Sequence, residues 1–165
     1  MADVRIQRPL SVPPVPAFGT LQEVLDGIAS QKGSWCDFTL HVSLGDLHLP
    51  DVGYVAVPIA LSAGHPMDGR HALELTFTSS KNPTSFPTFR GTAGIDSTGP
   101  SGSILWLGGA YDVPMSLFGR LFDATVAAGV AARTLENLAD DLAAAVVAIV
   151  EKREEEYLRY SLYRR

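Results

Sequence analysis

The chain has 165 residues, 46% of them hydrophobic, and carries a formal net charge of -5. This length and composition predict one globular domain over residues 1–165 with a core of its own, and they exclude a disordered chain. The acidic balance argues against a nucleic-acid surface, which needs clustered Lys and Arg to neutralise phosphates.

Cysteine and histidine usage argues against disulfide and metal chemistry. Cys36 is the only cysteine, so no intrachain disulfide can form. No Cys/His array has the spacing of a structural zinc site, and we expect neither a metal nor a cofactor. The N-terminus lacks a basic segment followed by an apolar run, so we expect neither secretion nor membrane insertion. Together these features favour a cytoplasmic protein.

Residues 1–33 are expected to form an extended arm and a short helix. Closely spaced prolines in "VRIQRPLSVPPVPAF" remove backbone donors, so residues 4–12 are predicted to be an edge strand or an arm. Thr20 is predicted to cap a helix over residues 21–29, with Glu23 completing a capping box.

Residues 34–112 show an alternating pattern that predicts an antiparallel sheet. The turn segments between the apolar runs are short, which calls for hairpins and favours a curved meander. About five consecutive strands are predicted from the following alternating residues: Phe38, Leu40, Val42, Leu44; Val55, Val57, Ile59, Leu61; Leu73, Leu75, Phe77; Phe89, Gly91, Ala93, Ile95; Leu105, Leu107, Gly109, Tyr111.

After Pro114 the apolar residues recur at three- and four-residue intervals, which predicts a C-terminal helix over residues 115–158. A helix of roughly 40 residues is about 60 Å long, more than the width of a small domain. It must therefore kink near Gly129 or project at its end. Asp140 and Asp141 are expected on its exposed face as solvated charges.

Four segments carry a resemblance to a known family: "FPTFRG", "LWLGGAYDVP", "SLFGRLFD" and "VAARTLENLADDL". They resemble the last half of START-like helix-grip proteins (SRPBCC), the superfamily of polyketide cyclases and lipid-transfer proteins, and the resemblance covers roughly residues 52–150. It implies an α+β fold in which a curved antiparallel sheet wraps around a long C-terminal helix, with a short N-terminal helix. It also implies a cavity between sheet and helix, but not an activity.

The apolar strand faces and the facing helix are predicted to line that cavity. Small helix residues leave volume unfilled, whereas the alternative is that aromatic side chains fill the space, since interiors close-pack. The predicted ligand-binding wall consists of Val57, Ile59, Leu75, Phe77, Phe89, Ile95, Leu105, Leu107, Tyr111, Phe118, Phe122, Thr125, Val126 and Gly129.

Polar groups are scarce on this predicted wall. Tyr111 is the best candidate to orient a ligand, although a strand-end tyrosine also serves to anchor a helix on a sheet. His71 lies next to a turn and is expected to face solvent. Cys36 has no basic neighbour to lower its pKa, so no catalytic residue is assigned.

Two features suggest association between copies of the chain. Ile104 and Trp106 alternate with wall residues and should lie on the outer face of the sheet. The tail "EKREEEYLRYSLYRR" places Tyr157, Tyr160 and Tyr163 among charges. Either the tail packs on a partner in a homodimer or on that outer face, or it is a frayed, solvated helix end.

Three functions remain open. The favoured one is binding of a small hydrophobic or amphipathic ligand, lipid-like in character, without catalysis. The second is a polyketide cyclase- or dehydratase-like enzyme in which Tyr111 or His71 moves a proton. The third is an interaction module with a filled core that acts through Trp106 and the tail.

Overall fold

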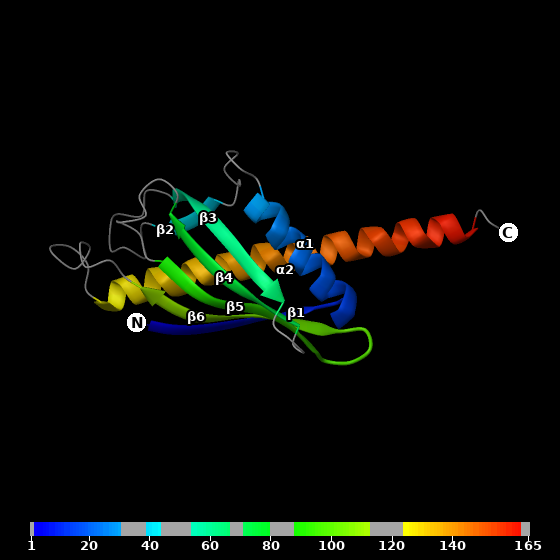
Figure 1. Ribbon diagram of the computed structural model, residues 1–165, viewed down its shortest axis with the longest axis horizontal. Helices are drawn as coiled ribbons and strands as arrows, with labels where there is room; N and C mark the ends of the chain where they lie inside the picture. Colours follow the sequence, from blue (N-terminus) through cyan, green and yellow to red (C-terminus); the bar gives the residue numbers. More distant parts are fainter. Residues whose placement is uncertain are drawn as a thin grey trace.

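The computed structural model describes residues 2–30, 39–43, 54–66, 71–79, 88–112 and 124–162. These residues form, in chain order, β1 (Ala2–Leu10), α1 (Pro14–Ser30), β2 (Thr39–Ser43), β3 (Tyr54–Pro66), β4 (Ala72–Ser79), β5 (Thr88–Ser97), β6 (Ser103–Asp112) and α2 (Ala124–Leu162). Figure 1 shows the long helix α2 running along the curved sheet and continuing past it.

The six described strands form one antiparallel sheet in the order β1-β6-β5-β4-β3-β2. Each strand from β2 to β5 pairs with the next one in sequence, which confirms the predicted meander. β1 is the edge strand expected for the N-terminal segment, and it pairs along its whole length with β6, from Ala2 opposite Tyr111 to Leu10 opposite Ser103. Pro9 is tolerated there because an edge strand leaves one side of its backbone unpaired.

Burial alternates along the central strands as the sequence pattern predicts. The inward side chains of β4, β5 and β6 are almost completely buried, whereas most of the side chains between them are exposed or only half-buried. Every second residue of a strand points to the same face, so one face of the sheet is dry. The buried inward residues are Leu73, Leu75, Phe77, Phe89, Ala93, Ile95, Leu105, Leu107 and Tyr111.

Helix α1 begins earlier than predicted, so the Thr20 capping box is wrong. The helix starts at Pro14, and the backbone N–H of Ala17 already donates to the carbonyl of Pro13 at 3.1 Å. Prolines fit here because backbone N–H groups in the first turn of a helix have no acceptor within the helix, so the N–H that proline lacks is not needed. Thr20 lies well inside the helix and is buried, and Leu21 and Leu25 are completely buried in the core.

Helix α2 covers the dry face through one stripe of residues and then leaves the domain. Its buried residues follow three- and four-residue spacing: Leu135, Leu138, Ala139, Leu142, Val146 and Val150. All residues from 151 to 162 are exposed, so the prediction that the end of the helix projects is confirmed. The helix is described to Leu162, beyond its predicted end, and the predicted positions 115–123 lie outside the described residues.

Candidate functional site

The dry face of the sheet carries an aromatic cluster near one end of β4, β5 and β6. Phe77, Phe89 and Tyr111 lie opposite one another in the register of the three strands. The rings of Phe77 and Phe89 stack with centroids 4.9 Å apart, and Tyr111 lies 5.1 Å from Phe89 and 5.9 Å from Phe77. Cross-strand aromatic pairs of this kind stabilise a sheet. The cluster therefore makes a rigid apolar wall on the face of the sheet that α2 covers.

Tyr111 brings a polar group to this wall. Its side chain is only 2% exposed, and its hydroxyl has no hydrogen-bond partner within the described ranges. Burial raises the pKa of Tyr111 well above its ordinary value, because the phenolate would lose its hydration. The hydroxyl therefore stays protonated and is available as a hydrogen-bond donor.

The structure brings half of the predicted wall together. Leu75, Phe77, Phe89, Ile95, Leu105, Leu107 and Tyr111 all belong to one buried cluster. That they contact a ligand stays a prediction, since burial alone is equally expected of a packed core.

The other predicted wall residues are placed less completely. Val57 and Ile59 lie on β3, and Thr125, Val126 and Gly129 lie in the first two turns of α2, so their backbone positions are described. Phe118 and Phe122 lie outside the described residues. The resemblance to helix-grip proteins remains the basis for including these residues in the wall.

The alternation predicts Gly91 and Gly109 on the inward face of the sheet, but it does not predict that the two glycines pair with each other. Gly91 on β5 lies directly opposite Gly109 on β6, and the ring of Phe89 leans over both. A Cβ atom at Gly109 would lie 2.8 Å from Phe89 Cζ and 2.5 Å from the Cα of Gly91. The missing side chains thus let the aromatic ring rest on the backbone of the sheet. The glycines of "FRGTAGI" and "WLGGAYD" were the available signal.

The outer face of the sheet has a hollow of about 720 Å³ around Trp106. The indole lies against Gly94, and the guanidinium carbon of Arg5 stands 6.0 Å from the ring centroid, within cation–π range. Trp106 is half-buried by these contacts, and Ile104 is half-buried too. Both lie where the alternation predicts, but Trp106 is already covered in part by its own chain.

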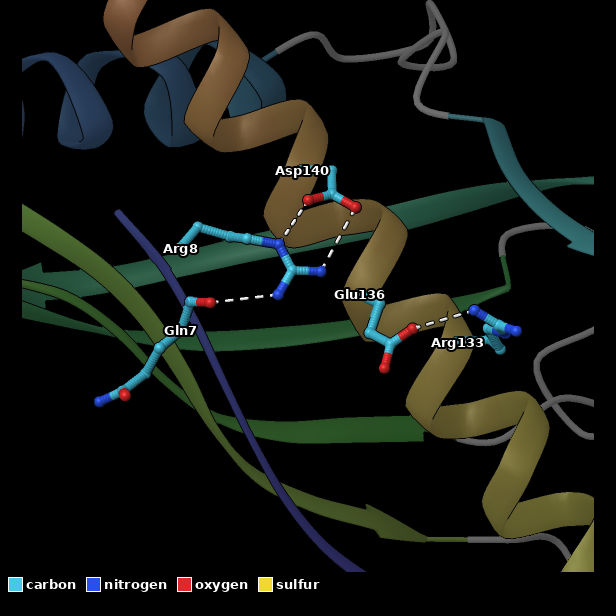
Figure 2. Close-up of polar contacts among 5 residues, drawn as sticks. All are labelled: Gln7, Arg8, Arg133, Glu136 and Asp140. Atoms are coloured by element: carbon cyan, nitrogen blue, oxygen red, sulfur yellow. Dashed lines mark hydrogen bonds and ion pairs between the residues drawn. The ribbon is translucent and has the colours of Figure 1, made fainter. Parts of the chain in front are cut away.

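One ion pair joins the edge strand to the long helix. Arg8 on β1 points toward α2 and donates from both Nε and a terminal nitrogen to the carboxylate of Asp140, while its other terminal nitrogen donates to the carbonyl of Gln7 at 3.1 Å (Figure 2). Asp140 is 57% exposed, as expected of a charge on the outer side of the helix, but it is paired with Arg8 and not simply solvated. A two-pronged contact has a defined direction, so this pair adds a specific contact between β1 and α2 to the pairing of β1 with β6.

The remaining candidates lie away from the interior. His71 immediately precedes β4 and is exposed, and its ring stacks on Phe18 of α1 with centroids 5.1 Å apart. Among the described residues no group of three His, Cys, Asp or Glu side chains is placed to hold a metal ion. None of the described helices is long and apolar enough to cross a membrane.

The fold is similar to that of several solved structures. The Zhui aromatase/cyclase from Streptomyces sp. R1128 matches with a TM-score of 0.54 and 14% identity, over 92% of this chain and 94% of that one. Ara h 8.0201 matches with a TM-score of 0.52 and 8% identity, over 92% of this chain and 98% of that one. A START superfamily protein from Mycobacterium smegmatis matches with a TM-score of 0.44 and 14% identity, over 91% of this chain and 97% of that one.

No protein-family model and no curated protein sequence matches this chain. At such low identities a structural likeness establishes the fold and not the activity. With a curved antiparallel sheet, a long C-terminal helix along its dry face and the matches to Zhui and Ara h 8.0201, the chain has the helix-grip fold of these two structures.

Proposed function

We propose that the protein binds a small hydrophobic or amphipathic molecule between the dry face of the sheet and α2. The observation that carries the proposal is the Tyr111 hydroxyl, which is buried in an apolar wall and has no partner among the described residues. A buried hydroxyl without a hydrogen bond costs about 1–3 kcal/mol. A ligand with one polar group could remove that cost and place its apolar body against Phe77 and Phe89.

The composition of α2 supports a space for such a ligand. The described helix opens with "ATVAAGVAA", in which the side chains are small at most positions. Small side chains on a helix that faces a sheet leave volume that the sheet residues must fill or a ligand can occupy. Binding energy would come from burial of apolar surface, at about 25 cal/mol per Å².

A cyclase-like enzyme is the second candidate. An aromatase/cyclase is among the structural neighbours, and Tyr111 stays protonated, so it could act as a proton donor but not as a base. His71, the other residue considered for proton transfer, is exposed and packs on Phe18. An enzymatic function therefore depends on Tyr111 together with groups outside the described residues.

Native mass spectrometry of the purified protein, followed by solvent extraction, tests the proposal. A stoichiometric apolar adduct released on denaturation is the expected result. Titration with an anilinonaphthalene sulfonate dye then compares the wild type with Tyr111→Phe, and with Tyr157→Phe as the control, because Tyr157 is 76% exposed on the projecting end of α2.

The proposal expects weaker dye binding in the Tyr111 variant alone. A bare mass together with no saturable dye binding would favour a filled core and an interaction module. Turnover of a polyketide-type chain that is lost in Tyr111→Phe and kept in Tyr157→Phe would favour the enzyme.

A further inference from the structure

The last three turns of α2 project from the domain, which they contact through the ion pair of Arg153 with Glu23 on α1. Val150 is the last buried residue of the helix, and all residues from 151 to 162, here called the projecting tail, are exposed. At 1.5 Å per residue the projecting tail is about 18 Å long. Figure 1 shows it extending beyond the sheet and α1 toward the C-terminus.

The projecting tail concentrates exposed apolar side chains. Tyr157 is 76% exposed, Leu158 60%, Tyr160 78% and Leu162 77%. Within the described part of the chain the only other large apolar side chain so exposed is Val15, at 70%. Single exposed apolar residues need no explanation, but four on one short helical segment indicate a contact surface.

Helical spacing places a continuous strip on one side of the projecting tail. Glu154, Leu158 and Ser161 follow at four and then three residues, so they lie one above another, with Tyr157 and Leu162 beside them. The strip carries the acidic Glu154 at one end, the apolar Leu158 in the middle and the small side chain of Ser161 at the other end.

The charges of the projecting tail are divided along its length. Glu151, Glu154, Glu155 and Glu156 fall in its first half together with Lys152 and Arg153, which gives two positive and four negative charges, a net charge of -2; Arg153 is already engaged by Glu23 of α1. Arg159 follows, and the sequence continues with Arg164 and Arg165. Along the sequence the charge therefore changes from net negative in residues 151–156 to net positive in residues 157–165.

We propose that two copies of this chain associate through their projecting tails in an antiparallel arrangement. Two-fold symmetry then sets the acidic half of each tail beside the basic half of the other and buries Tyr157, Leu158 and Leu162 between them. Parallel pairing would place the glutamates of one tail against those of the other, and like charges in contact are unfavourable. A surface of this size is below the usual range for stable interfaces, so the dimer forms by mass action as concentration rises.

Sedimentation equilibrium across micromolar to near-millimolar concentration tests the association. The wild type should shift from monomer to dimer, and Leu158→Glu should weaken the dimer by roughly tenfold or more, because it puts a charge into the apolar middle of the strip. Val15→Glu makes the same kind of change at an exposed position on α1 and should leave the dimer unchanged. Leu158 is exposed, so circular dichroism should show the same fold in both variants.

Cysteine cross-linking tests the orientation. Glu154→Cys and Ser161→Cys lie on the same strip, two turns apart, and the parent chain with Cys36 alone gives the background. In the antiparallel arrangement a mixture of the two variants forms mixed disulfides in preference to disulfides between identical chains. A wild type that stays monomeric, a dimer that survives Leu158→Glu, or cross-links mainly between identical variants would each overturn the proposal.

Discussion

Replacing Gly91 by alanine should destabilise the protein. Inside a helix or strand alanine is normally the more stabilising residue, because glycine loses more conformational entropy on folding. A Cβ atom built on Gly91 would lie 2.2 Å from the carbonyl oxygen of Gly108, 2.7 Å from the Cα of Gly109 and 2.7 Å from Phe89 Cζ. Two of these neighbours are backbone atoms of the adjacent strand, which cannot turn away as a side chain can. The β5–β6 ladder must therefore open locally to admit a single methyl group.

The expected loss follows from the cost of overpacking. Extra carbon atoms in a well-packed interior typically cost about 1–3 kcal/mol. For a chain of this length each kcal/mol corresponds to about 2–4 °C in Tm. Gly91→Ala should thus melt several degrees below the wild type, and Phe89 should lose its packing on the glycine pair.

Urea unfolding followed by circular dichroism measures this change, with Gly19→Ala as the matched control. Gly19 lies in α1, and a Cβ atom there would have nothing within 4 Å, so alanine should stabilise the helix by about 0.5–1 kcal/mol. The two identical substitutions should have opposite signs. A Gly91→Ala protein as stable as the wild type would refute the reasoning that the two strands are held in contact at this point.

Three further predictions rest on single contacts. Tyr111→Phe should stabilise the ligand-free protein by about 1 kcal/mol in urea unfolding, because it removes a buried hydroxyl that has no partner within the described ranges; a loss of stability would reveal a hidden hydrogen bond. The pKa of Glu23 lies below its ordinary value because Arg153 donates a hydrogen bond to it, so its contribution to stability is present above about pH 4.5 and is lost as the pH falls through the lower folded value. Glu23→Gln should flatten that acidic part of the stability profile, and an unchanged profile would count against the pair. Leu142→Ala should cost about 2–5 kcal/mol, since Leu142 is fully buried, whereas Val15→Ala should stay within about 0.5 kcal/mol; similar losses would contradict the burial of α2.

The strands and the long helix could be predicted because their patterns are local. Alternation in β4 to β6 and three- or four-residue spacing in α2 each reflect one buried face, which a sequence displays directly. The start of α1 could not be placed in the same way. The proline run around Pro14 is typical of an extended arm, but the first turn of a helix accepts proline equally well, and the burial of Ala17 and Thr20 in the core is what favours the helix.

The candidate site depends more on pairing between distant segments. The inward position of Phe77, Phe89 and Tyr111 follows from alternation, but that the three rings meet depends on strand register. The contact of Arg8 with Asp140 likewise joins residues 132 positions apart, which no local pattern indicates. The ligand, the wall residues of α2 and a cytoplasmic location remain predictions.

The sheet order has a consequence for how the protein is made. β1 is synthesised before the other five described strands, yet its partner β6 comes roughly a hundred residues later, and Ala2 lies opposite Tyr111. At 5–20 residues per second, β1 must wait about 5–20 s for β6 to be translated. During that time its apolar residues, among them Ile6 and Leu10, have no ladder to join. Nascent chains should therefore be open to chaperone binding at β1, and folding should be slow because the pairing of β1 with β6 is long-range.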